Sequence, residues 1–186
     1  MTLRGEILSI VGGFLQRRGY KVVVLNPNDL NSSTGFNPLE FVQNTADMEY
    51  IMRSLLMSST NSSSGGSERF WNESAIALLT LIGNLLVAIG KKQYINLPNV
   101  KYLLNNFANN SNDIDNLVIN YASADLTMEF RQFKSYDDPV KLSILATASM
   151  ALAPIANNEA LKRIMGSSSF DFKRMRTEKI ALFLSI

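Results

Sequence analysis

The chain has 186 residues, of which 46% are hydrophobic and 18% are charged. This composition is typical of a globular protein with one good-sized core, and it is too apolar for a disordered chain. Cysteine and histidine are both absent, which excludes disulfides, zinc sites of the usual Cys/His kind and a Ser-His-Asp triad. The net charge of +2 is too small to indicate nucleic-acid binding by itself.

The first part of the chain predicts a helix followed by a strand. Apolar residues recur at helical spacing over 3–18, and Gly19 stands where that helix would end. A run rich in β-branched residues follows at 20–25 and is closed by Asn26 and Pro27. Because the run is almost continuously apolar, it is typical of a strand in a buried parallel sheet.

From Pro38 to about Ile164 the sequence predicts helices only. They are expected at 38–58, 68–92, 98–109, 112–123, 126–135, 138–156 and 158–165. The segment 68–92 is apolar nearly all round, so we expect it to run through the middle of a helical bundle. The Ser- and Gly-rich stretch 58–67 predicts a flexible loop. No membrane span is expected, because the most apolar stretch, 75–89, is shorter than the roughly 20 residues that a span needs.

The last residues, 179–186, have the composition of a second strand. Two strands separated by so long a helical region cannot form a sensible sheet alone, since a two-stranded sheet is marginal in water. We therefore expect a mainly α chain, truncated at both ends, in which a helical bundle is inserted between strands of a larger α/β domain. The expected divisions are 1–37 for part of the α/β domain, 38–166 for the all-α domain, and 167–186 for the return linker and strand.

No convincing catalytic group is visible. The Gly-bearing segment at 62–67 is not preceded by a strand, and it lacks the Lys that ends a phosphate-binding loop. Paired carboxylates such as Asp113 and Asp115 are explained as helix caps or solvated side chains, which leaves open only a magnesium ion held by carboxylates. We expect no enzymatic activity, catalytic residue, cofactor or metal ligand in this chain.

Two segments, 130–136 and 170–174, mix basic with aromatic side chains. Such mixtures can stack bases and neutralise the phosphates of a single strand. The candidate nucleic-acid contacts are therefore Arg131, Lys134, Lys173 and Arg174. Aromatic residues at this spacing are also typical of a core, and a mild basic excess over 159–179 is equally expected of a solvated surface. Both interpretations stay open.

Short motifs in order along nearly the whole chain resemble the TraG-type conjugative coupling proteins, the DNA-transfer ATPases of bacterial type IV secretion. The matching segments are Leu3-Arg4-Gly5-Glu6, Gly19-Tyr20-Lys21-Val22-Val23-Val24-Leu25-Asn26, Phe36-Asn37-Pro38-Leu39, Phe70-Trp71-Asn72-Glu73-Ser74-Ala75 with Leu78-Leu79, and Thr177-Glu178-Lys179-Ile180-Ala181-Leu182-Phe183. Residues 2–4 are Thr-Leu-Arg where the family shows Asp-Pro-Lys.

The resemblance implies a RecA-like, homohexameric motor, tethered to the inner membrane, that hands a relaxase-bound single DNA strand to the secretion channel. Its all-α domain lies at the cytoplasmic end of the motor and helps to select the substrate. On this basis the chain is a fragment that helps recruit the relaxosome or single-stranded DNA, while ATP and magnesium bind elsewhere in the parent protein. The alternative is a protein-only docking module that contacts relaxase or an adaptor and never DNA.

Overall fold

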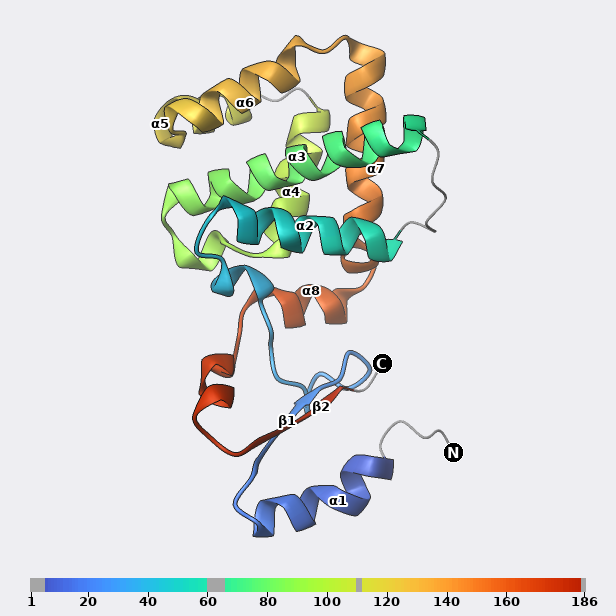
Figure 1. The fold of residues 1–186 in the computed structure, drawn as a ribbon, viewed down its shortest axis with the longest axis vertical. Coiled ribbons are helices and arrows are strands. Elements are labelled where there is room, and N and C mark those ends of the chain that lie inside the picture. Colours follow the sequence, from blue (N-terminus) through green and yellow to red (C-terminus); the bar gives the residue numbers. More distant parts are fainter. Residues whose placement is uncertain (1–5, 60–65, 110–111, 185–186) are drawn as a thin grey trace. The chain divides into compact units, whose positions relative to one another are not determined.

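The computed structural model describes residues 6–59, 66–109 and 112–184 (Figure 1). In chain order its elements are α1 (Glu6–Arg17), β1 (Lys21–Leu25), η1 (Pro38–Phe41), α2 (Thr45–Ser59), α3 (Gly66–Ile89), η2 (Lys92–Tyr94), α4 (Leu97–Ala108), α5 (Asn112–Tyr121), α6 (Ala124–Ser135), α7 (Asp138–Ala156), α8 (Glu159–Gly166), η3 (Phe172–Arg176) and β2 (Ile180–Leu184), where η denotes a 3-10 helix. The prediction of a mainly α chain with one strand near each end is confirmed.

The chain divides into two compact units. Residues 38–158 form one, called the helical unit below, and residues 1–37 together with 159–186 form the other, called the strand unit. The helix α8 therefore groups with the strands, whereas the sequence predicts an all-α domain that extends to residue 166. The predicted loop 58–67 falls mostly on residues 60–65, which lie outside the described part of the chain.

The single helix predicted over 38–58 is wrong, because the structure has a 3-10 turn at 38–41 and a separate helix that begins at Thr45. Local hydrogen bonds explain the break. The Asn44 side chain accepts from the backbone N–H of Asp47 at 2.9 Å, and the Asp47 carboxylate accepts from the N–H of Gln43 at 2.9 Å. Asn44 is thus the N-cap of α2, and the Asp47 carboxylate fixes the residue before it, so a new helix starts at this point.

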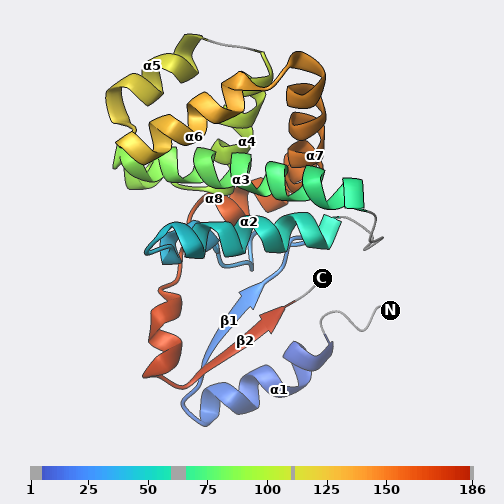
Figure 2. The same cartoon turned by 45° about the horizontal axis from the view of Figure 1, so that its top comes forward.

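The helix α3 is the centre of the helical unit, as predicted. It packs against α2, α4, α5, α6 and α7, and Figure 2 shows it between α2 and α6. Leu79, Ile82 and Leu85 on this helix are completely buried. Gly83 lets α2 approach closely, because a Cβ atom there would lie 2.4 Å from Sδ of the buried Met48.

Two helices of the helical unit, α3 and α7, are long and apolar enough to cross a membrane by length and composition alone. Central helices of globular proteins meet the same criterion, and these two pack against each other and against α2 and α4. Their composition is therefore explained by their place in the core of the helical unit.

The strand unit contains a parallel pair in which Lys21 lies opposite Ile180 and Leu25 opposite Leu184. Gly19 ends α1 in the left-handed region, at φ 82°, and turns the chain into β1. Val23 is 3% exposed, but no residue of β2 is buried although all five are apolar. Strands of parallel sheets are normally covered on both faces, so this pair leaves much apolar surface uncovered.

The two segments that join the helices to the strands run side by side within the strand unit. The N–H of Phe36 donates to the carbonyl of Ile164 at 2.7 Å, and the N–H of Gly35 donates to Oγ of Ser169 at 2.8 Å. The segments are so close at Gly35 that a Cβ atom there would lie 2.2 Å from the carbonyl oxygen of Ser167. Only glycine fits this crossing.

Candidate nucleic-acid interface

The four predicted contact residues lie in two separate places. Arg131 and Lys134 are on α6 of the helical unit, whereas Lys173 and Arg174 are on η3 of the strand unit. The structure thus brings them together in pairs, each pair within one element.

On α6 the aromatic residues of the 130–136 motif are part of the core. Phe130 and Phe133 are 7% and 8% exposed, and both pack edge-on against Phe107 with ring centroids 5.8 Å apart. Lys134 lies over the ring of Phe130, and its Nζ is 3.4 Å from a carboxylate oxygen of Asp115. Buried rings cannot stack on bases, so the core interpretation holds for these two phenylalanines, and only Arg131 extends freely into solvent.

The helix η3 carries three basic side chains and packs on neighbouring aromatic rings. Asp171 caps this helix by accepting from the N–H of Lys173 at 3.0 Å. Phe172 packs edge-on against Phe170 and Phe36, with ring centroids 5.1 Å and 4.9 Å apart. Phe172 is half-buried against these two rings, whereas Lys173 and its basic neighbours on η3 are exposed to solvent.

Two further lysines lie beside each other at the start of the paired strands. Lys21 and Lys179 are adjacent at the start of the two parallel strands, where the N–H of Lys21 donates to the carbonyl of Lys179 at 2.8 Å. Their ammonium groups lie over Phe170 and Tyr20, at 4.7 Å and 5.9 Å from the ring centroids. The resulting basic ridge consists of Lys21, Lys173, Arg174, Arg176 and Lys179, all of them exposed.

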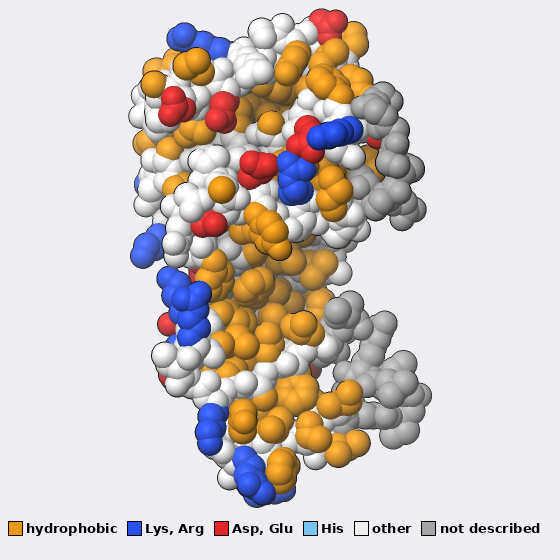
Figure 3. Space-filling view, viewed as in Figure 1, with side chains coloured by type: hydrophobic (Ala, Val, Ile, Leu, Met, Phe, Trp, Pro, Cys, Tyr) orange, Lys and Arg blue, Asp and Glu red, His pale blue; other side chains and the backbone are white. Residues whose placement is uncertain are grey.

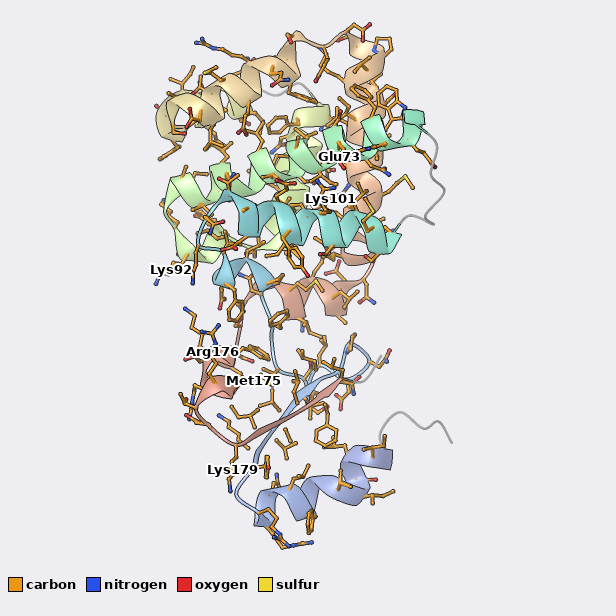
Figure 4. All side chains as sticks on the ribbon, in the orientation of Figure 1. Glu73, Lys92, Lys101, Met175, Arg176 and Lys179 are labelled. Carbon is orange, nitrogen blue, oxygen red and sulfur yellow. The ribbon has the colours of Figure 1, made fainter. Side chains whose placement is uncertain are left out.

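Figure 3 shows basic side chains along η3 and the start of β2, and Figure 4 shows Arg176 and Lys179 extending from the same side of the strand unit. Two acidic residues accompany the ridge: Asp171 caps η3, and Glu178 accepts a hydrogen bond from Nε of Arg174. That hydrogen bond raises the pKa of Arg174 further above its ordinary value, so the guanidinium stays charged. The ridge keeps a net positive charge.

Sequence reasoning missed Lys21, Arg176 and Lys179 as part of the site. Arg176 and Lys179 stand in the basic stretch 159–179, whose charge excess was visible. Lys21 carries no such signal, because it joins the ridge only through the parallel pairing of β1 with β2. Among the described residues, no group of three His, Cys, Asp or Glu side chains could hold a metal ion.

The fold and the ridge define a class of protein: a mainly α chain with a helical unit and a small parallel α/β unit that carries a basic ridge. A protein-family model described as type IV secretory system conjugative DNA transfer matches residues 2–186. The chain therefore belongs to this family, and the resemblance drawn from its motifs is confirmed. A search of curated proteins found no match.

Proposed function

We propose that this chain is the all-α region, with part of the adjoining motor domain, of a conjugative coupling protein, and that it helps bring single-stranded DNA of the relaxosome to the transfer machinery. The observation that carries the proposal is the basic ridge on a chain of the conjugative DNA-transfer family. Five exposed Lys and Arg side chains from three segments can follow a phosphate backbone.

Uncovered apolar surface supports the view that the strand unit is part of a RecA-like α/β domain. Ile7, Ile10 and Phe14 on one face of α1 are 62%, 75% and 49% exposed, and Figure 3 shows hydrophobic side chains gathered over the strands and α1. A larger sheet would cover these residues and pair the outer edges of β1 and β2. We infer that further strands and helices of the same motor domain are their partners.

Membership of the family supports the remaining parts of the proposal. ATP and magnesium bind to other parts of the parent protein, which assembles as a homohexamer at the cytoplasmic side of the bacterial inner membrane, with the relaxase and the secretion channel as partners. This chain alone has no ATP turnover. Incubation of the purified chain with ATP and magnesium checks this point, and robust phosphate release would contradict it.

Fluorescence anisotropy with a labelled single-stranded oligonucleotide tests the DNA contact. Binding at low salt should weaken as salt rises, with a log–log slope of about −3.5 if all five ridge cations contact phosphates. The triple variant Lys173→Gln/Arg176→Gln/Lys179→Gln should reduce that slope by about 2. Lys92→Gln, which removes an exposed cation of the helical unit outside the candidate contacts, is the control and should leave the slope unchanged.

Absence of binding at low salt would overturn the DNA contact, and equal slopes for the triple variant and the wild type would overturn the role of the ridge in it. If the triple variant keeps the wild-type slope and Arg131→Gln binds the oligonucleotide more weakly, the DNA contact lies on α6. The second candidate function, docking of relaxase or an adaptor without DNA, is favoured by acidic side chains on the helical unit. A pull-down with cognate relaxase from nuclease-treated lysate separates it from the first.

A further inference from the structure

Two adjoining hollows open on the helical unit. The larger, of about 420 Å³, lies among α2, α3, α6 and the start of α7, and the smaller, of about 310 Å³, lies among the start of α2, α3 and α6. Thr45 and Glu129 line both, so the hollows form one groove. No Lys or Arg side chain lines either hollow, although the helical unit has several.

The larger hollow has an apolar floor. Ile76, Phe133 and Ile144 line it and are 1%, 8% and 0% exposed. A floor of this kind can take an apolar side chain and remove it from water, which is favourable.

The rim of the groove is acidic. Glu49 and Glu73 line the larger hollow and are both bound by Arg53, at 2.8 Å and 2.7 Å. Asp125 and Glu129 stand one helical turn apart on α6, and neither forms an ion pair with another described residue. Partial burial, and then the nearby Asp125, raise the pKa of Glu129, and a cation held between these two carboxylates would offset the repulsion between them.

A buried hydroxyl in the same groove also lacks a partner. Thr80 lines the larger hollow and is 6% exposed, and its Oγ1 has no hydrogen-bond partner within the described residues. A buried hydroxyl without a partner destabilises the fold, because it has lost its hydrogen bonds to water. A polar group of a ligand that enters the hollow would satisfy it.

We propose that this groove receives a protein segment that presents an arginine or lysine beside apolar side chains. The cation lies between Asp125 and Glu129, an apolar neighbour fills the larger hollow over Phe133, and a backbone group of the segment hydrogen-bonds to Thr80. Nucleic acid does not fit, because its phosphates would meet four carboxylates. The inference deepens the proposed function, since it names the chemistry of a protein partner for the helical unit.

Anisotropy with short fluorescein-labelled peptides tests the groove. The probe has one arginine between two pairs of leucines in a Gln/Ala background, and its matched partners replace the arginine by glutamate or the leucines by serine. The arginine–leucine peptide should bind the full chain with a Kd below about 1 mM, and each matched peptide should bind at least about tenfold more weakly. Equal binding of the arginine and glutamate peptides, or binding of none of them, would overturn the proposal.

Variants of the chain locate the binding. The double variant Asp125→Asn/Glu129→Gln should bind the arginine–leucine peptide about tenfold or more weakly than the wild type. Thr80→Val should bind it about threefold more weakly. The control Asp113→Asn removes an exposed carboxylate of the same unit outside both hollows and should bind as wild type. The double variant should fold, because it keeps the size of both side chains and removes the repulsion between two carboxylates on the surface of α6. If it binds the peptide like wild type, the groove is not the site.

A single-stranded oligonucleotide separates this inference from the DNA contact. Excess oligonucleotide should leave peptide binding unchanged, and displacement of the peptide would mean that the groove binds nucleic acid. If the peptide does not bind while DNA binding is intact and salt-dependent, only the inference about the groove is wrong. If the peptide binds and the oligonucleotide does not, only the proposed role of the basic ridge is wrong.

Discussion

Replacement of Gly35 by alanine should open the crossing between the two linking segments of the strand unit. The added Cβ would lie 2.2 Å from the carbonyl oxygen of Ser167, where such contacts are not found below 3.0 Å, so the two backbones must separate by roughly 0.8 Å. That movement breaks the hydrogen bonds between Gly35 and Ser169, at 2.8 Å and 3.3 Å. Two lost hydrogen bonds and the steric strain together cost about 3 kcal/mol.

The amide proton of Phe36, which donates to Ile164, reports this opening directly. A destabilisation of about 3 kcal/mol should lower its protection against hydrogen exchange by about 100-fold. Trp71, the only tryptophan, lies in the helical unit. Its fluorescence should therefore show urea unfolding of that unit at the same midpoint in the variant as in the wild type. Gly166→Ala is the control, because nothing would lie within 4 Å of a Cβ atom added there. A Phe36 amide that stays protected to within about threefold in Gly35→Ala would refute the reasoning.

Three further substitutions test the packing and charges of the helical unit. Gly83→Ala should destabilise it by about 1–3 kcal/mol, because its Cβ would lie 2.4 Å from Sδ of Met48; urea denaturation should show a smaller loss once Met48→Ala makes room, and strictly additive losses would contradict the contact. Asp137→Ala removes the cap that accepts from the N–H of Val140 at 3.1 Å and should cost about 1 kcal/mol, whereas Asp113→Ala should cost less. Arg53→Gln should cost about 1 kcal/mol or less at pH 7, since its carboxylate partners are half exposed. Hydrogen bonding from Arg53 lowers the pKa of Glu73 below its ordinary 4.5, so the stabilisation is present above that pH and is lost as the pH falls through the folded-state pKa. The difference between wild type and Arg53→Gln should therefore shrink in acid, and a difference that grows there would contradict the assignment.

The regular elements could be predicted from the sequence because their signals are local. The Asp138–Pro139 pair that begins the predicted helix 138–156 and the apolar run of β1 depend on neighbouring residues only, although the N-cap in the structure is Asp137. The break between η1 and α2 was missed because apolar residues continue at helical spacing through it, while the capping bond between Asn44 and Asp47 decides the outcome. A periodic pattern shows which side of a segment is buried, but it does not show where the backbone changes direction.

The candidate sites were harder to predict for a different reason. The basic ridge combines Lys21 with residues more than 150 positions later, and this pairing exists only in the folded sheet. The acidic groove joins Glu49, Glu73 and Glu129 from three helices, and each appears in the sequence as an ordinary solvated side chain. Composition also conceals both sites, because a net charge of +2 averages a basic region with an acidic one.

This separation of charge connects the two proposals. The cations of the ridge belong to the strand unit, and the unpaired carboxylates Asp125 and Glu129 belong to the helical unit. A ligand that carries both a polyanion and a cationic protein segment, as a protein-bound DNA strand does, could engage each unit with the charge that suits it. Both contacts weaken with salt, but only the ridge releases the counterions condensed on nucleic acid. Peptide binding to the groove should therefore fall much less steeply with salt than oligonucleotide binding to the ridge.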